Sequence, residues 1–486
     1  MQVHITRQEH GITNINKNIE RRSRMKKSLR FITTAVVLTI ATITSACGNT
    51  RNVDKITSGN GEIPTYKSFE NPDEEGLFFG IYIDPTQQTV EAYQKVKDCG
   101  VRTVIIDPWS GTALNSDGLG KALDCCDEVG LDAFILVNNS HMTEHEEDLE
   151  SFVDLATVDY TKYPAFKGVY AFDEPSMTQM DWIVEDMKKW ESSIYKDYIY
   201  LVNMMRSDDT TGTDTAEYLQ TYWDKVLSKN DDNILIYDVY PLYAKVGDKT
   251  LPYLRDFTLP AMESFANLAK EHDSEFYAYL QTYCSKDGEV RDMVSVNDAR
   301  FQVAYNLAYG VKGFVCFTYA TLSQFGDSMV SGNGQELPKY YYIQEVFSEL
   351  KNWEHVYKSF DWEGTMTLLG KERGYGAQDE SHIKELQYSI DSHERIESVE
   401  TEYDLLVGTF KDAKDNDGFL FASYTDPYYM KDNEIKVSFK DASKALIYYN
   451  GDLLTNDDES TCYLLEDGVL EFDLEAGDYL FVVPVN

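Results

Sequence analysis

The chain has 486 residues, of which 44 are Lys or Arg and 83 are Asp or Glu, so its formal net charge at pH 7 is −39. Apolar residues make up 43% of the chain, which excludes an intrinsically disordered protein. A single long apolar run excludes a polytopic membrane protein. The acidity argues against nucleic acid as a partner, because a phosphate backbone needs a basic face. The length predicts two domains.

The N-terminal residues have the composition of an export signal. Residues 1–30 hold eight basic and two acidic residues, and the uncharged run Phe31–Ala46 follows them. This run is too short for a comfortable membrane span but suits the core of a signal peptide, and a signal of more usual length begins at Met25. Small residues then precede a cysteine in Thr44–Cys47 (TSAC), a pattern that resembles the bacterial lipobox.

The lipobox resemblance implies that a signal peptide over residues 1–46 is removed and that Cys47 carries a lipid such as palmitate. The mature protein is then expected outside the cytoplasm, anchored by this lipid in the cell membrane or at the cell surface. An ordinary secretory signal and an uncleaved anchor are the alternatives. Without residues 1–46, 36 basic and 81 acidic residues remain, which is a net charge of −45. Residues 47–75 are polar and typical of a tether.

The cysteines that follow Cys47 show no spacing typical of a disulfide framework, and a chain of this length does not need one. We therefore expect buried free thiols. These cysteines are Cys99, Cys125, Cys126, Cys284, Cys316 and Cys462.

Between residues 76 and 353, apolar runs alternate strictly with longer segments of helical period. The expected strands cover 77–84, 102–108, 133–138, 167–174, 199–205, 234–240, 276–282 and 313–319. The expected helices cover about 87–98, 117–129, 146–157, 177–193, 214–228, 258–272, 296–309 and 338–353. Eight strands that are each followed by a helix predict an α/β fold, a (β/α)8 TIM barrel over 76–353. A doubly wound sheet of eight strands is the alternative.

The pattern changes after the last of these helices, and residues 354–486 predict an all-β sandwich. Short β-type runs alternate there with turn signals such as Asp417-Gly418 and Asn450-Gly451. The expected strands of this second domain cover 403–409, 418–423, 434–439, 444–449, 469–473 and 479–484.

Nearly every expected strand of the barrel ends in a polar residue. In (β/α)8 barrels the active residues stand at these C-terminal ends, so the set marks the candidate site. Capping of the following helix is the alternative for Asp84 and Asp107. In chain order the residues are Asp84, Asp107, Asn138, Asp173, Glu174, Asn203, Asp238, Tyr240, Gln281, Thr318 and Tyr319.

Among these polar strand ends, the clearest candidate for a catalytic residue is Asp173-Glu174-Pro175, at the end of the fourth expected strand. Pro175 disfavours a helical conformation at the preceding residue, so the strand ends there and Glu174 is held at its rim. A carboxyl with apolar and aromatic surroundings can have a raised pKa and serve as a general acid. An acidic cluster at a helix N-terminus is the alternative.

Residues 76–353 resemble the barrel of glycoside hydrolases of the β-galactosidase/cellulase (clan A) superfamily. The segments that carry the resemblance are 168–176 (GVYAFDEPS), 201–204 (LVNM), 237–242 (YDVYPL), 279–282 (YLQT) and 308–319 (AYGVKGFVCFTY). The resemblance implies an exported glycosidase that cleaves oligo- or polysaccharides with Glu174 as its acid. Two positions depart from the family pattern, because Asp173 stands where Asn is usual and Gln281 stands where the glutamate nucleophile is usual.

Glycosidases generally need a second carboxyl, and Asp238 at the sixth strand is the best candidate. A substrate-assisted scheme that pairs Asp173 with Glu174 is the alternative. Successive strand residues point to opposite faces, so both carboxyls reach one site only past the strand end. The residues expected to bind the carbohydrate are Asp84, Asp107, Trp109, Asn138, Asn203, Tyr240, Gln281 and Tyr319.

The sequence predicts neither a cofactor nor a metal site. His141–His145 matches a zinc-peptidase pattern, but its place after the third strand favours an ordinary helix start. Because of Gln281, a catalytically inactive glycan-binding surface lipoprotein is an alternative function. A structural surface protein that only retains the barrel is another.

Overall fold

The structure is a computed structural model. It describes residues 56–57, 62–108, 116–137, 158–206, 212–230, 232–245, 251–372, 383, 386–456 and 460–486. Outside these ranges lie the predicted signal peptide, Cys47, Trp109, Asn138 and His141–His145. Within these ranges, no helix has the length and the apolar character needed to cross a membrane.

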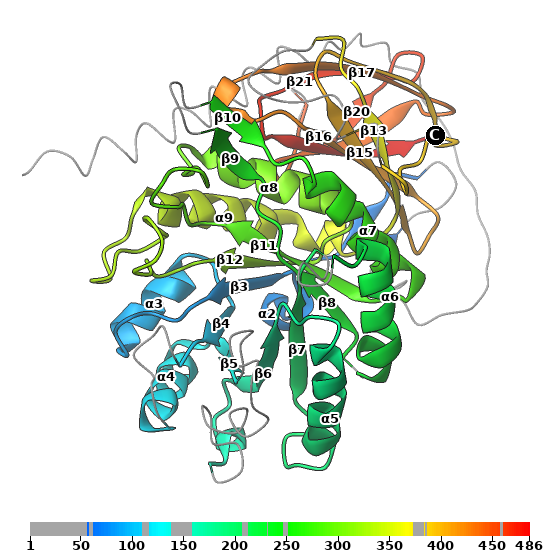
Figure 1. Ribbon diagram of the computed structural model, residues 1–486. Helices are drawn as coiled ribbons and strands as arrows, with labels where there is room; N and C mark the ends of the chain where they lie inside the picture. The colour runs from blue at the N-terminus through cyan, green and yellow to red at the C-terminus, as the bar shows by residue number, and fades with distance from the viewer. Residues whose placement is uncertain are drawn as a thin grey trace, which may run out of the picture.

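Eight parallel strands form a closed barrel, which confirms the predicted (β/α)8 fold (Figure 1). The last strand pairs with the first, from Gly313 beside Phe78 to Phe317 beside Tyr82, which rules out the open doubly wound sheet. In spatial order the strands are β3 (Phe78–Tyr82), β4 (Thr103–Ile106), β5 (Asp132–Leu136), β6 (Phe166–Asp173), β7 (Ile199–Met204), β8 (Ile234–Tyr237), β11 (Glu275–Gln281) and β12 (Gly313–Phe317).

Helices surround this barrel, and seven of them lie where the sequence predicts a helix; the expected helix over 146–157 lies outside the described residues. They are α3 (Val90–Asp98), α4 (Ser116–Val129), α5 (Gln179–Glu191), α6 (Thr215–Lys225), α7 (Thr258–Glu271), α8 (Val296–Ala308) and α9 (Pro338–Tyr357). Strand side chains alternate between the helix layer and an inner cluster that includes Tyr82, Tyr170, Leu201, Ile236 and Tyr279.

The C-terminal part is a β-sandwich, as predicted, with a core that includes Val407, Phe421, Val437, Phe472 and Val482. The larger sheet contains β13 (Phe360–Leu368), β15 (Leu405–Asp412), β16 (Asp417–Ser423), β22 (Tyr479–Val485), β18 (Lys444–Tyr449), β19 (Asp452–Leu453) and β20 (Cys462–Leu464). The smaller sheet contains β14 (Ile396–Thr401), β17 (Asn433–Phe439) and β21 (Val469–Leu474).

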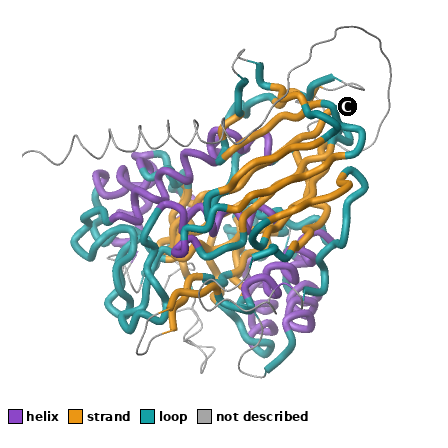
Figure 2. The backbone as a smooth tube through the Cα atoms, turned by 90° about the horizontal axis from the view of Figure 1, so that it is seen from above, coloured by secondary structure: helices purple, strands orange, loops and turns teal. Residues whose placement is uncertain are grey.

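The sandwich packs directly against the barrel (Figures 1 and 2). The second face of its larger sheet, with Leu406, Phe410, Leu420 and Phe481, belongs to the same apolar cluster as the helix layer of the barrel. Helix α8 is therefore covered on all sides, and every residue from Asp298 to Ala308 is buried. A helix without a solvent face needs no polar stripe, which is why its sequence is only weakly amphipathic.

The six cysteines after Cys47 carry free thiols, as predicted. Cys99, Cys125, Cys126 and Cys316 are buried, whereas Cys284 and Cys462 are partly exposed.

Candidate active site

Strand β6 brings two adjacent carboxyls to the C-terminal end of the barrel by means of a β-bulge. The register of β6 against β7 shifts between Tyr170 and Phe172. Tyr170 belongs to the inner cluster, whereas Ala171 and Phe172 both pack in the helix layer. The extra residue reverses the alternation, so Asp173 returns to the side of Tyr170. Its Oδ1 accepts a hydrogen bond of 2.8 Å from the Tyr170 hydroxyl.

Glu174 leaves the strand direction immediately after the bulge. Its φ is +48°, a left-handed conformation that is uncommon for residues other than glycine, and its amide donates to the carbonyl of Asn203 at 3.0 Å. The strand ends at Asp173, and Pro175 follows Glu174 as the sequence requires. Residues held in such conformations cluster at functional sites. Successive residues of a strand normally point to opposite faces. The bulge and the left-handed conformation of Glu174 together explain how the side chains of Asp173 and Glu174 can both reach one site.

A chain of hydrogen bonds fixes the Asp173 carboxylate. Asn203 at the end of β7 is 1% exposed, and its Nδ2 donates to Asp173 Oδ1 at 3.0 Å. The Tyr279 hydroxyl on β11 donates to the Tyr170 hydroxyl at 2.9 Å, and Tyr170 in turn donates to Asp173. Three strands thus orient one carboxylate oxygen.

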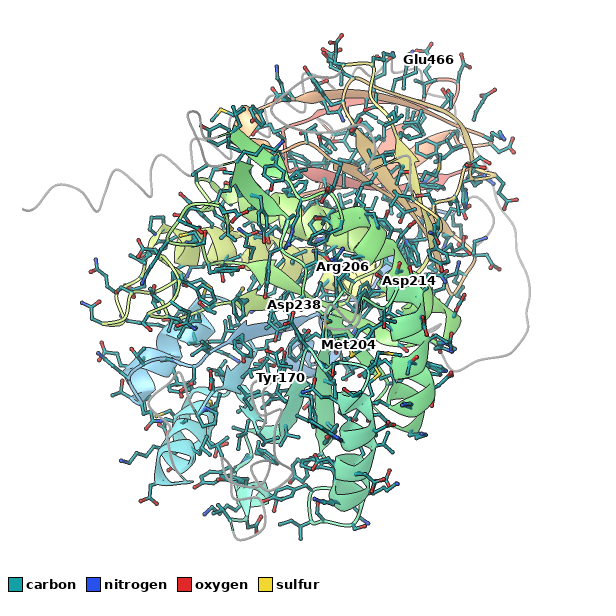
Figure 3. All side chains as sticks on the ribbon, viewed as in Figure 1. Tyr170, Met204, Arg206, Asp214, Asp238 and Glu466 are labelled. Atoms are coloured by element: carbon teal, nitrogen blue, oxygen red, sulfur yellow. The ribbon has the colours of Figure 1, made fainter. Side chains whose placement is uncertain are left out.

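Asp238 follows β8, near Glu174; Figure 3 labels Asp238 and Tyr170 within the barrel. Burial raises the pKa of Asp238 well above its usual value, and the nearby Glu174 and Asp173 raise this pKa further. Asp238 therefore keeps its proton to a higher pH than an isolated aspartate does. The Tyr240 hydroxyl donates to Asp238 Oδ2 at 3.3 Å.

Two buried oxygens at this end of the barrel, Asn203 Oδ1 and Asp238 Oδ1, have no hydrogen-bond partner among the described residues. Buried polar atoms are normally paired, and an unpaired one needs an explanation such as a water or a ligand. A hydroxyl-bearing or amide-bearing ligand would supply the missing donors.

An aromatic surface lies beside the carboxyls. Tyr240 and Tyr283 have ring centroids 5.2 Å apart, and Tyr283 lies 5.3 Å from Phe317 and 4.8 Å from Phe325. Burial raises the pKa of Tyr283, and the nearby Tyr243, Asp238 and Glu174 raise it further. Tyr240 was predicted as a site residue, but Phe317 and Phe325 were not, because nothing distinguishes these apolar residues from core residues in the sequence.

Asp84 and Asp107, two further predicted site residues, differ in position. Asp84 is fully buried and faces the helix layer, where it accepts hydrogen bonds from the Tyr93 hydroxyl at 3.1 Å and the Asp107 amide at 3.3 Å. Burial raises its pKa to about 7. Asp107 is 4% exposed and lies near the Tyr82 hydroxyl in the barrel interior. Asp84 does not cap α3, since Thr89 has that role.

Gln281 and Tyr319, both predicted to bind substrate, have other partners. Gln281 is fully buried; its Oε1 accepts from the Leu242 amide at 2.9 Å, and its Nε2 donates to the carbonyls of Leu242 and Arg291 at 3.1 and 3.0 Å. Leu242 begins a hairpin, β9 (Leu242–Lys245) and β10 (Leu251–Leu254), that the sequence did not predict. Tyr319 is 2% exposed and packs in the helix layer. Neither side chain is brought together with Asp173, Glu174 and Asp238.

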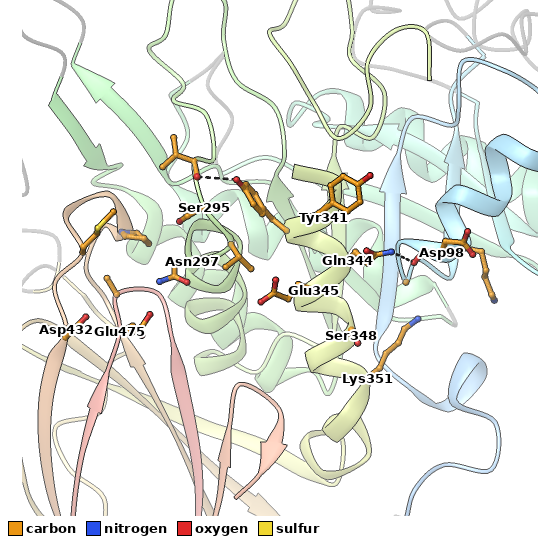
Figure 4. A pocket seen from close by; sticks show the side chains of 18 residues that line it. Asp98, Ser295, Asn297, Tyr341, Gln344, Glu345, Ser348, Lys351, Asp432 and Glu475 are labelled. Carbon is orange, nitrogen blue, oxygen red and sulfur yellow. Dashed lines mark hydrogen bonds between the residues drawn. The ribbon is translucent and has the colours of Figure 1, made fainter. Parts of the chain in front are cut away.

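A groove of about 1120 Å³ lies elsewhere, between α9, the start of α8 and the loops of the sandwich (Figure 4). Its lining includes Tyr341, Gln344 and Glu475 but none of the predicted site residues. The groove is therefore not part of the candidate active site. In the described part of the chain, no three His, Cys, Asp or Glu side chains are grouped so that they could hold a metal ion.

No protein-family model and no curated protein sequence matches the chain. It is similar to solved structures, among them a glycoside hydrolase family 30 subfamily 8 xylanase from Clostridium acetobutylicum, with 8% identity over 85% of this chain and 97% of that chain and a TM-score of 0.41. An α-L-fucosidase isoenzyme 2 from Paenibacillus thiaminolyticus has 8% identity over 84% and 100%, with a TM-score of 0.38. An endoglucanase from Pseudomonas stutzeri has 13% identity over 56% and 93%, with a TM-score of 0.35.

Identities this low describe the fold alone. The type of barrel that the sequence resemblance implied is confirmed by the closed eight-stranded parallel barrel of this chain itself.

Proposed function

We propose that this protein is an exported glycosidase that cleaves oligo- or polysaccharides with Glu174 as its general acid. The observation that carries the proposal is the group of three carboxyls, Asp173, Glu174 and Asp238, at the C-terminal end of a (β/α)8 barrel, with Asp173 fixed by hydrogen bonds. We assign the chemistry to the barrel, residues 76–353, and not to the sandwich, residues 354–486.

This group of carboxyls supplies a proton where glycoside cleavage needs one. A general acid works best when its pKa lies near the working pH, and burial together with like charges shifts a carboxyl in that direction. The proton passes to the glycosidic oxygen, which leaves as an alcohol. Asp173, Glu174, Asp238 and Tyr240 are half-buried, so part of each residue is accessible to a substrate. The adjoining rings of Tyr283 and Phe317 offer surface on which a sugar ring can stack.

A glycan-binding protein without activity is the second candidate, and one observation favours it. Gln281 occupies the strand-seven position, its amide is bound to backbone, and it cannot act as a nucleophile. A screen of the purified protein against aryl glycosides and polysaccharides separates the two candidates. Turnover that disappears in Glu174→Gln supports the enzyme, whereas glycan binding without turnover in the wild type supports the binding protein.

We propose further that residues 1–46 direct export and that Cys47 carries the lipid anchor. The support is the basic start, the uncharged run and the lipobox-like TSAC. When a cell lysate is partitioned between a detergent phase and an aqueous phase, the Cys47→Ser variant should be found in the aqueous phase and the wild type in the detergent phase. Retention in the detergent phase would contradict lipidation at this residue.

A further inference from the structure

We propose that the β9–β10 hairpin and Arg255, which directly follows it, form a subsite for an acidic sugar whose carboxylate or sulfate group pairs with the Arg255 guanidinium. This inference rests on the proposed function, because it takes the ligand to be a glycan and names the class of glycan. Three observations carry it: the place of the hairpin in the barrel, the difference between its two faces, and the hydrogen bonds of Arg255.

The hairpin stands at the end of the barrel where the carboxyls lie (Figure 1). It belongs to the connection from β8, which ends at Tyr237, to α7, which begins at Thr258. In a (β/α)8 barrel such strand-to-helix connections form the C-terminal face. The Gln281 side chain, at the end of β11, accepts from the amide of Leu242 at 2.9 Å and donates to its carbonyl at 3.1 Å. The first strand of the hairpin is therefore fixed beside the rim.

The two faces of the hairpin differ in exposure. One face is covered by the rest of the protein, and its members are Leu242, Ala244, Pro252 and Leu254. The other face carries the cross-strand pair Tyr243 and Tyr253, which are half-buried with ring centroids 6.1 Å apart, and the exposed Lys245. Arg255 is half-buried, and its guanidinium carbon lies 4.6 Å from the Tyr243 ring centroid. Cations and tyrosine rings thus share one accessible face, and such rings can stack on a sugar.

Arg255 has no carboxylate partner among the described residues. The described arginines that form ion pairs with carboxylates are Arg102, Arg291, Arg300 and Arg395. Arg255 instead donates through Nη1 to the Tyr243 hydroxyl at 2.8 Å, and its guanidinium carbon lies 3.9 Å from the Phe257 ring centroid. The neighbouring Asp256 accepts from the Phe257 amide at 3.1 Å.

The remaining donors of Arg255 match an anion. Its Nε and Nη2 donate to no described residue, and together they form the planar fork that binds two oxygens of a carboxylate or sulfate. The chain has 83 acidic and 44 basic residues, so carboxylates that could pair with an arginine are plentiful. An arginine that none of the described carboxylates pairs with is therefore a group that a bound anion would satisfy.

A second arginine adds positive charge at the same place. Arg206 follows β7, the strand whose Asn203 donates to Asp173, and β7 is the neighbour of β8 in the barrel. The Arg206 guanidinium carbon lies 4.1 Å from the Phe257 ring centroid, and the Arg255 carbon lies 3.9 Å from it. The two guanidinium carbons are therefore no more than 8.0 Å apart, the sum of these distances.

Tyr283 connects this positive charge to the carboxyls. Its ring centroid lies 5.2 Å from that of Tyr240, whose hydroxyl donates to Asp238 at 3.3 Å. Burial raises the pKa of Tyr283, Tyr243 and Asp238 raise it further, and Arg255 opposes them. An oligosaccharide that spans the rim would place one sugar at the carboxyls and the acidic group of another on Arg255.

The net charge of −39 does not exclude an anionic ligand at this position. At physiological ionic strength, interactions between exposed charges are screened beyond about 8 Å, so the nearest groups decide. Around the fork of Arg255 these groups include Arg206 and the Tyr243 hydroxyl. A neutral sugar would leave Arg255 without a counter-charge, so we expect the subsite to prefer an acidic one.

The test compares oligosaccharides of hexuronic acids with their carboxyl-reduced forms, and sulfated oligosaccharides with their desulfated forms. Each neutral form keeps the linkages and loses only the charge. Calorimetry measures binding at about 0.15 M salt, where long-range repulsion is screened. Glu174→Gln replaces the wild type for any ligand that is degraded. We expect one acidic class to bind about tenfold or more tightly than its neutral form, and that class identifies the anion as carboxylate or sulfate.

Arg255→Gln should remove this preference and change the affinity for the neutral form by less than about twofold. Arg255→Lys should retain only part of it, because an ammonium group lacks the fork. Lys188→Gln is the matched control, since it removes one positive charge from an exposed position on α5. The comparison of acidic and neutral ligands in the wild type does not depend on the folding of any variant.

The outcomes separate this inference from the proposed function. Equal affinity for acidic and neutral forms, or a preference that persists in Arg255→Gln, would overturn the subsite. Glu174-dependent turnover of neutral glycans alongside that result would leave the glycosidase standing. An equal loss of affinity for both forms in Arg255→Gln would also overturn the subsite, because Arg255 would then only support the rim. An Arg255-dependent preference without turnover would support the subsite and favour the binding protein, whereas no binding of any glycan would contradict both proposals.

Discussion

Asp84 is fully buried behind β3, with hydrogen bonds from the Tyr93 hydroxyl and the Asp107 amide, and its pKa is raised to about 7. Between about pH 4 and pH 7 the folded state holds a proton at this site that the unfolded state has lost. The stabilising contribution of Asp84 is therefore fully present below its pKa in the unfolded state and is lost as the pH rises through its pKa in the folded state. Over this range the free energy of unfolding falls by at most about 1.4 kcal/mol per pH unit.

We expect Asp84→Asn to flatten this part of the stability profile, which urea unfolding at pH 5 and pH 8 measures. The exposed Asp197→Asn should leave the profile unchanged. An unchanged pH dependence in Asp84→Asn would show that Asp84 does not titrate in this range.

The candidate site could be predicted in part from single residues. Asp173, Glu174, Asn203, Asp238 and Tyr240 meet because parallel strands of a barrel end at one rim. The same rule cannot give the direction of a side chain. Asp84 turns away after Ile83 adopts a φ of +69°, and the amide of Gln281 is taken up by a hairpin far from it in sequence. The tyrosines that orient Asp173 were missed because they lie inside strands, where they resemble core residues.

At the level of elements, the geometry of β6 depends on Gly168. A Cβ at this position would lie 1.9 Å from the carbonyl oxygen of Ile199 on β7, and the φ of +152° is one that other residues rarely adopt. Because Gly168 precedes the bulge, a larger side chain must shift β6 against β7 and displace Asp173 and Glu174.

We expect Gly168→Ala to lower the free energy of unfolding by about 2 kcal/mol or more and to lower activity per folded molecule. Gly332→Ala is the control, because nothing lies within 4 Å of its added Cβ. Urea unfolding and turnover measure the two effects. Wild-type values for Gly168→Ala would show that the close approach of β6 to β7 does not hold the site in place.

Most elements follow from local sequence, because a long apolar run in a parallel strand is covered on both faces and has a clear signal. The bulge in β6 has no such signal, since it adds only one residue to an apolar run. Strand β14 was not predicted because most of its side chains are not buried and its sequence lacks an apolar run. The β9–β10 hairpin was missed because its four-residue strands are too short to stand out.

In the whole molecule, barrel and sandwich share one apolar cluster, and Arg300 is a buried charge within it. Arg300 is fully buried on α8 and forms ion pairs with Glu345 at 2.6 Å and Glu349 at 2.5 Å, while Asp478 of the sandwich lies 4.0 Å away. Removing one member of a buried ion pair leaves an uncompensated charge, which costs about 3–5 kcal/mol.

Arg300→Met should therefore lower the unfolding midpoint strongly, and barrel and sandwich should still unfold in one transition. Lys188→Ala, which breaks an exposed pair with Glu185, should change stability by less than about 1 kcal/mol. Calorimetry of both variants checks this, and two separate transitions in the wild type would contradict the shared core.

The most direct measurement for the whole molecule is the rate of Glu174→Gln on two glycosides of the same sugar, one with a poor and one with an activated leaving group. Positioned acid catalysis contributes about 10²–10⁴-fold, so the variant should lose at least about a hundredfold on the poor leaving group. It should lose much less on the activated one, because that group departs with little protonation. An unchanged rate on the poor leaving group, in a folded variant of an active wild type, would contradict the role of Glu174 as the acid.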